Sequence, residues 1–323
     1  MVGRAPLPDP KAVLVINFRY HLVSLTAVFL ALTVGLILGT AALNGPAMEA
    51  LESTSQGLRD SNEQLRAQVT QLEEQLGDEQ EFAAEIAPTY LANRLTGRNI
   101  LVVALPDADT RAVDGAVEML GLAGATVSGR ISVLDDFFDP AHADQLVDLV
   151  DTTTPATVTT PVTYDGVQAM SHVLAAVTTG KAGGTTVAIT PGDITTVTTA
   201  LDQISMLTVE TAPTGVADGV LILAGAGSTD SDAEVRNTGM VTLTNEFALD
   251  APTVYGAMNS AGDGNPIATI RADDTGTVAT VDNARFTQGQ IAAAAALGDF
   301  ITTGTVDHLG IGEGASALLP EAA

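Results

Sequence analysis

Closely spaced aspartates are the first residues in this sequence whose types and spacing could do chemistry. They are Asp107 and Asp109, Asp135 and Asp136, Asp230 and Asp232, and Asp273 and Asp274. A calcium-binding loop needs acidic ligands at alternate positions, a central glycine and a terminal glutamate. None of the four stretches supplies that set, so we expect solvated loop acids.

A glycine-rich turn, Gly225–Ser228, follows the strongly apolar stretch that begins at Asp218. Such a turn can present backbone N–H groups to an anion. It lacks the third glycine of a dinucleotide-binding fingerprint, and no phosphate-binding lysine follows it. We therefore expect an ordinary turn at a strand end, with an anion-binding domain as an alternative.

Metal ligands and nucleophiles are scarce. The chain has no cysteine, and none of its four histidines has another histidine three or four residues away. The seven methionines form no cluster that would suit Cu(I), and neither GxSxG nor HExxH occurs. We expect the histidines on the surface or at helix caps and the methionines in the core or at an interface. The sequence thus predicts no catalytic residue, no metal site, no cofactor and no enzyme.

Apolar runs alternate with helical stretches beyond residue 94, which predicts an α/β domain with a mostly parallel, Rossmann-like layered sheet over residues 95–310. The expected strands are 99–106, 125–134, 185–190, 218–227, 251–258, 266–272 and 276–282. The expected helices are 109–123, 165–177, 193–207 and 288–302. The Gly- and Ala-containing residues 311–323 predict a flexible tail.

A membrane-spanning helix is predicted near the N-terminus. Leu22–Leu43 is apolar almost throughout, and 22 residues at 1.5 Å each are enough for a bilayer core of about 30 Å. The preceding arm, residues 1–19, holds three basic residues and one acidic residue. The positive-inside rule predicts a single-pass protein of the cytoplasmic membrane, with residues 20–43 in the lipid bilayer, the arm in the cytoplasm and the C-terminal domain in the periplasm-like cell-wall space. A cleaved signal peptide and a buried core helix are the alternatives.

A heptad pattern follows directly, in residues 44–88. Leucines 51, 58, 65 and 72 recur every seven residues, which is typical of the d positions of a parallel coiled coil. A polar Asn62 at an a position would set register and oligomeric state. We expect a homodimer or a partner coiled coil through residues 48–86, with the helix stopping or bending at Pro88. The predicted interface residues are Met48, Leu51, Leu58, Asn62, Leu65, Val69, Leu72 and Leu76. The alternative is one amphipathic helix that folds back on its own domain.

Net charge argues against one class of partner. The formal charge is −26, and the part after residue 43 holds 10 basic against 38 acidic residues, a net −28. A body with so few cations cannot replace the counterions of phosphates, so we expect no nucleic-acid partner.

The order of these segments resembles one known family. The anchor FRYHLVSLTAVFLALTVGLILG (residues 18–39), the leucine heptad and the segment ILVVALPDAD (residues 100–109) are similar to the actinobacterial copper transporter (MctB) family. The resemblance extends over essentially the whole chain and includes, within that family, the SteB-type septal regulators of corynebacteria.

This resemblance implies two different roles. The SteB-type role implies a bitopic envelope protein that regulates peptidoglycan hydrolase activation and daughter-cell separation through contacts with a SteA-like membrane protein and a peptidoglycan hydrolase. The alternative role is copper transport or copper homeostasis in the cell envelope, and only this role implies copper. A single spanning helix cannot enclose a pore, so the residues favour the first role.

Overall fold

The computed structural model describes residues 18–161, 165–260, 264–273 and 276–321, and the side chains of residues 41–44, 46 and 47 lie outside that description. The chain divides into two compact units, residues 1–75 and 76–323. The predicted cytoplasmic arm, residues 1–19, lies almost wholly outside the described residues.

Helix α1 runs continuously from Phe18 to Leu91. Its first part, Phe18–Thr40, has a mean hydropathy of 2.4, and by length and composition it can cross a membrane. The helix continues one turn past Pro88, where we expected a stop or bend. Ala87 and Leu91 are fully buried on either side of that proline, and their packing holds the last turn in place.

Seven strands form the sheet of the second unit, in the order β5-β2-β1-β6-β7-β8-β9. All neighbours are parallel except β5, which is antiparallel to β2. The strands are β1 (Asn99–Ala104), β2 (Thr126–Val133), β5 (Leu207–Thr211), β6 (Gly219–Ala224), β7 (Thr253–Ala257), β8 (Val278–Val281) and β9 (His308–Leu309). This is the mostly parallel α/β sheet that the sequence predicts.

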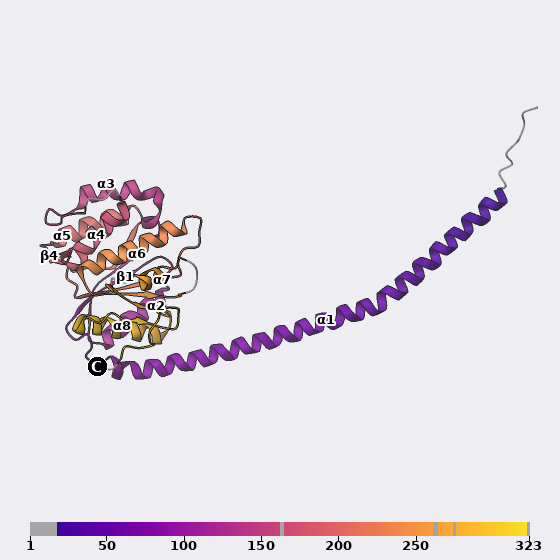
Figure 1. The fold of residues 1–323 in the computed structure, drawn as a ribbon, viewed down its shortest axis with the longest axis horizontal. Helices are drawn as coiled ribbons and strands as arrows, with labels where there is room; N and C mark the ends of the chain where they lie inside the picture. Colours follow the sequence, from indigo (N-terminus) through magenta and orange to yellow (C-terminus); the bar gives the residue numbers. More distant parts are fainter. Residues whose placement is uncertain (1–17, 162–164, 261–263, 274–275, 322–323) are drawn as a thin grey trace, which may run out of the picture. The chain divides into compact units, whose positions relative to one another are not determined.

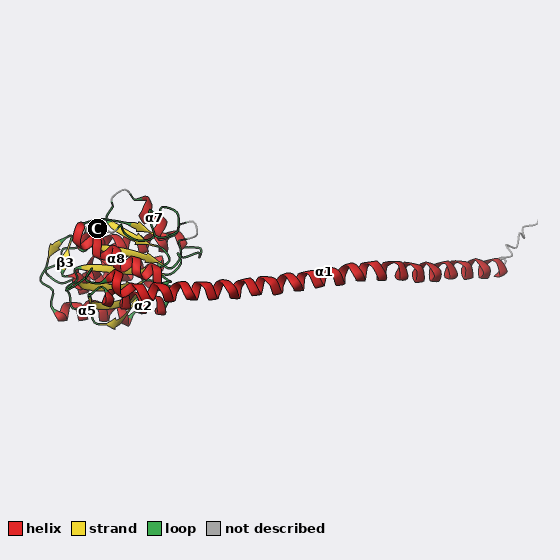
Figure 2. Ribbon diagram, turned by 90° about the horizontal axis from the view of Figure 1, so that it is seen from below, coloured by secondary structure: helices red, strands yellow, loops and turns green. Residues whose placement is uncertain are grey.

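Helices cover both faces of the sheet (Figure 1). One face packs against α4 (Gly166–Thr179), α5 (Pro191–Gln203), α6 (Ala233–Asp250) and α7 (Pro266–Ala272). Helix α3 (Ala143–Thr153) packs on the outer side of α4 and α5 (Figure 1). The other face packs against α2 (Thr110–Leu122), α8 (Thr287–Thr303) and the last turns of α1. Figure 2 shows the same unit with its helices and strands distinguished by colour. Burial on both faces explains why β1 and β6 are continuous apolar runs.

Two of the expected strands are wrong. Residues 266–272 form helix α7, because Pro266 occupies the first helical position and the Asn265 side chain caps the helix by accepting from the Ile267 N–H at 3.2 Å. Within 185–190, only β4 (Thr185–Thr186) is a strand, and it pairs with β3 (Lys181–Ala182) outside the main sheet.

The residues after Gly310, which the sequence predicts to be a flexible tail, make specific contacts with the end of β8. The Asp282 carboxylate is fully buried, and it accepts from the N–H groups of Ile311 and Gly312 at 2.8 and 2.9 Å. Arg271 is 3.0 Å from the same carboxylate and donates to the carbonyls of Leu309 and Glu313 at 2.7 and 2.9 Å. This ion pair fastens residues 310–320, which we call the C-terminal strap, to the end of β8.

A polar cluster is buried between α4 and α6. His172 Nδ1 lies 3.0 Å from Glu246 Oε2, and Gln168 donates to the other oxygen of Glu246 at 3.1 Å. His172 is therefore a core residue and not the surface or capping residue that we expected. The hydrogen bond with Glu246 raises the pKa of His172, although burial acts in the opposite direction. Burial raises the pKa of the nearby Asp250 carboxyl, which accepts from the Gly184 N–H at 3.0 Å.

This cluster predicts that the α/β unit loses stability as the pH rises. Because the pKa of His172 is raised in the fold, protonated His172 stabilises the folded state. This contribution is complete below the pKa of about 6.5 in the unfolded chain, and it is lost as the pH rises through the pKa in the folded chain. The raised pKa of Asp250 has the same sign, because ionising the buried acid disfavours the fold. We expect urea unfolding of the full chain in detergent to give a smaller free energy of unfolding at pH 8 than at pH 6.

The matched control is Glu246→Gln, which keeps the shape of the side chain but removes its charge. This variant should be less stable at pH 6 by roughly 1.5–3 kcal/mol and should show a flatter pH dependence. An unchanged slope in the variant would contradict the role of the pair.

Candidate functional site

The carboxyl ends of β1 and β6 are where an α/β sheet of this topology would bind a ligand. The chain passes from β1 to β2 on one side, while β6 lies on the other side of β1, so the strand order reverses between β1 and β6. Here, however, the loops fill the crevice. The Gly225 N–H donates to the Pro106 carbonyl at 3.1 Å, and a Cβ added at Gly225 would lie 2.4 Å from Asp107 Cβ.

The glycine-rich turn is an internal structural feature. The Ser228 N–H donates to Asn237 Oδ1 at 2.8 Å, and Asn237 Nδ2 donates back to the Ser228 carbonyl at 3.1 Å. Two backbone donors of the turn, at Gly225 and Ser228, are therefore already used. This arrangement favours the strand-end turn over the anion-binding alternative.

A shallow hollow of about 370 Å³ lies next to this crevice, at the ends of β1 and β2. Asp107, Asp135 and Asp136 line it, together with Ser132 and Ser205. Partial burial and the negative charges of Asp107, Asp136 and Asp230 raise the pKa of Asp135. A hollow with this charge repels anions and attracts cations.

Arg236 on α6 neutralises part of this acidic edge. Its Nε lies 2.7 Å from Asp232, its Nη2 lies 2.8 Å from Asp139, and its Nη1 donates to the Asp135 carbonyl at 3.0 Å. The hydrogen bond with Asp232 raises the pKa of Arg236. The guanidinium thereby ties α6 to the loop that follows β2.

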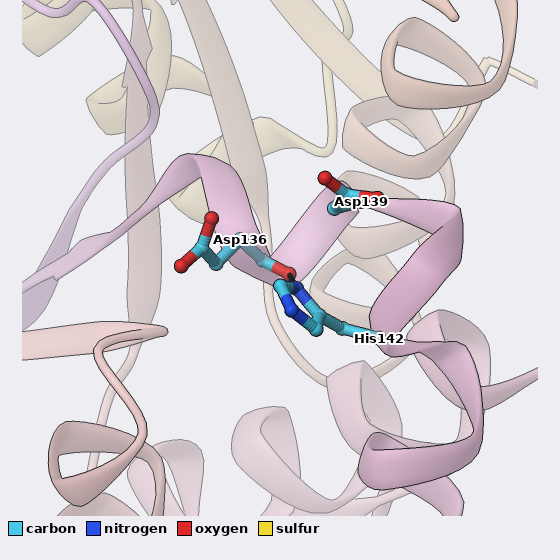
Figure 3. Close-up of side chains that lie close together, drawn as sticks. All are labelled: Asp136, Asp139 and His142. Carbon is cyan, nitrogen blue, oxygen red and sulfur yellow. Dashed lines mark hydrogen bonds between the residues drawn. The ribbon is translucent and has the colours of Figure 1, made fainter.

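A mixed cluster of possible metal ligands lies in the same loop. Asp136, Asp139 and His142 place one ligand atom each within 4.8 Å of one another (Figure 3). They belong to two short 3-10 helices, η1 (Asp135–Phe138) and η2 (Pro140–His142), and to the residue between them. Asp139 is already engaged, since one oxygen accepts from the Ala141 N–H at 2.8 Å and the other faces Arg236. The backbone hydrogen bond is the main cause that lowers the pKa of Asp139.

This cluster was missed in the sequence because its spacing, i, i+3 and i+6, does not match a known ligand motif. Two oxygen donors and one imidazole suit hard or borderline cations better than soft ones. Methionine thioethers, which are soft ligands, are not part of this cluster. In the described part of the α/β unit, Met119, Met170, Met206 and Met240 are core residues.

The predicted interface residues all lie on α1. Seven of them, from Met48 to Leu72, are exposed, and the apolar ones have exposed fractions between 53% and 68%. Leu76, the first residue of the second unit, is half-buried. Among the residues that the structure describes, none forms an apolar cover over the heptad side chains of the first unit.

An apolar groove of about 470 Å³ lies wholly within the second unit. One wall is formed by α1 residues, the other by the start of α8 and the C-terminal strap. The lining includes Leu76, Ala83, Ile86, Phe286, Ile311, Leu318 and Leu319. Sequence reasoning missed this groove, because the strap was expected to be flexible.

Comparison with known proteins extends over almost the whole chain. The family model described as "Copper transport outer membrane protein, MctB" matches residues 15–320. The protein named "Copper transporter MctB" in Mycobacterium tuberculosis (strain ATCC 25618 / H37Rv) is 27% identical over 314 residues, which is 94% of this chain and 98% of that protein. Its counterpart in Mycobacterium leprae (strain TN) is 28% identical over 317 residues, with the same coverage of both chains.

The geometry around Arg236 predicts a loss of stability when its side chain is removed. Arg236→Ala leaves Asp139 and Asp232 without their cation, so we expect a loss of about 2–3 kcal/mol in the free energy of unfolding. The measurement is urea unfolding of the full chain in detergent. Arg111→Ala is the control, since that side chain is 92% exposed and should change stability by about 0.5 kcal/mol or less. Equal effects of the two substitutions would contradict a stabilising role for the contacts of Arg236.

Proposed function

Because the chain belongs to the MctB family, we propose that it is a bitopic protein of the cell envelope that acts without catalysis, through contacts with other proteins. The observation that carries this proposal is the row of exposed heptad side chains on α1 from Met48 to Leu72, which we call the heptad stripe. It follows an apolar segment that is able to span a bilayer. Such a stripe is stable in water only when it is covered by another helix.

The proposed topology has the N-terminus in the cytoplasm and the α/β unit on the outer side of the cytoplasmic membrane. It is supported by the basic arm and by the acidic residues that follow the apolar segment. The family description refers to an outer membrane. One apolar helix of Phe18–Thr40 fits either placement as an anchor, but alone it cannot form a pore.

Copper handling is the role that the comparisons support, because the relatives are named copper transporters. Copper would be a cargo. The described residues offer it one surface cluster, Asp136, Asp139 and His142, which suits Cu(II) better than Cu(I). In that role the protein would act as an anchored envelope component beside a separate conducting protein.

Regulation of peptidoglycan hydrolase activation is the second role, and it rests on the resemblance of the anchor motif to SteB-type regulators. A SteA-like membrane protein and a hydrolase would be the partners. The heptad stripe supports this role in general terms, since an exposed helical seam can bind another helix.

The contact proposal predicts that charges in the heptad stripe abolish self-association. Leu58→Asp with Leu65→Asp places two carboxylates at d positions, and each lost leucine costs about 2–5 kcal/mol of packing. We expect the full chain in detergent to change from dimer to monomer when its mass is measured by light scattering.

The matched control is Gln56→Asp with Gln64→Asp, which adds the same charge on the outer face of the helix. This variant should remain a dimer. A dimer that survives both pairs of substitutions would show that the heptad stripe is not the interface.

The donor set predicts weak copper binding. The chain has no thiolate, and four of its thioethers, those of Met119, Met170, Met206 and Met240, are buried in the core. We therefore expect no stoichiometric Cu(I) binding at micromolar or tighter affinity to the full chain. Cu(II) binding should weaken by about tenfold or more in His142→Ala. Competition with a chromophoric copper chelator measures both. Tight Cu(I) binding would contradict the contact-only proposal and favour copper handling.

A further inference from the structure

The heptad phase of α1 does not end with the exposed stripe. Continued by sevens, the a and d positions are Leu76, Glu79, Ala83, Ile86 and Tyr90. These are the five α1 residues that line the apolar groove. Helix α1 is continuous through this region, so the same heptad phase runs from the exposed leucines into the groove wall.

Only part of this stripe is covered by the chain itself. Ala83 is 5% exposed and lies in the core beneath the sheet, whereas Ile86 is 43% exposed. Across the groove, Ile311 and Leu318 are 73% and 65% exposed, and Phe82 beside it is 64% exposed. The groove therefore has apolar walls on both sides and no apolar cover over them in the described chain.

The charges beside the stripe favour a second copy of this chain as the occupant. In a parallel coiled coil, g positions face the e positions of the other helix, and charges there select the partner. The g positions Thr54, Ser61, Gln68 and Gln75 carry no charge, and the e positions Glu52, Arg59, Arg66 and Glu73 hold two of each sign. Two like copies therefore meet with no like-charge pair between these rows, although the part after residue 43 carries a net −28. Among the a and d positions from Leu76 to Tyr90, Glu79 is the one charged residue that would face its own copy.

A basic or acidic partner helix would find no complementary row of charges on this face. Anchoring in one membrane also makes two copies parallel, so equal heptad positions of the two chains lie at the same level. The interface of such a pair is isologous, with each copy offering the same patch.

We infer that the groove is part of a two-fold interface between two copies of this chain. In this interface the α1 residues 76–90 of one copy pack against the same residues of the other copy. The C-terminal strap of each copy packs against the side of this helix pair. This inference rests on the proposed self-association and extends it from the heptad helix to the α/β unit. The strap thereby acquires a role in assembly.

Site-specific cross-linking of the full chain tests this inference, because the chain has no cysteine of its own. Ile86→Cys lies at a d position, where the two copies should meet, and a short bismaleimide should link it into a dimer. Glu85→Cys is the control, since it lies one residue away on an exposed outer face of the helix. We expect a dimer band for Ile86→Cys and little or none for Glu85→Cys.

A second pair of variants tests the strap. In the Ile86→Cys background, Leu318→Asp should raise the dissociation constant of the dimer by about tenfold and lower the cross-linking yield. Ala317→Asp adds the same charge at an exposed neighbouring position that does not line the groove, and it should leave the yield unchanged. Cooperative urea unfolding of each variant verifies that the α/β unit is folded.

The outcomes separate the two proposals. A wild-type chain that is monomeric by light scattering overturns the self-association on which this inference rests. A dimeric chain in which Ile86→Cys does not cross-link to itself, or links to a different protein in native membranes, overturns the groove inference alone. Equal yields for Leu318→Asp and Ala317→Asp overturn the role of the strap.

Discussion

The packing of the last turns of α1 under the sheet is the interaction on which the rest of the α/β unit depends. Ala83, Ala87 and Leu91 are buried in the same core as α2 and α8, so the helix supplies part of the layer that covers this face. Because the helix is fixed there, its neighbouring side chains must face outward beside the core. The groove between α1, α8 and the C-terminal strap is a direct result.

Much of the fold could be predicted from the sequence. β1 and β6 are apolar runs bounded by polar turns, and the apolar anchor and leucine heptad are long, regular patterns. Helix α6 was not predicted, because the core side of this helix is partly polar: Asn237, Glu246 and Asp250 are buried through pairings that a periodicity argument cannot foresee. Helix α7 was mistaken for a strand because its seven residues are too few to show a helical period.

The sites were harder to predict than the fold. The eight heptad residues could be named from their spacing, and they lie on one helix as expected. The groove could not be foreseen, because its second wall depends on the contact between Asp282 and residues 311 and 312, which are far apart in sequence. The Asp136, Asp139 and His142 cluster depends on two consecutive 3-10 turns, and no sequence motif marks them.

The charge of the chain after residue 43 bears on the kinetics of any self-association. Two bodies of net −28 repel each other at distances beyond contact, and this repulsion decays over a Debye length of about 8 Å at physiological ionic strength. The stripe that would join them carries little charge, so salt has little to screen once they are in contact. Added salt should therefore speed the encounter of two chains and leave their dissociation rate nearly unchanged.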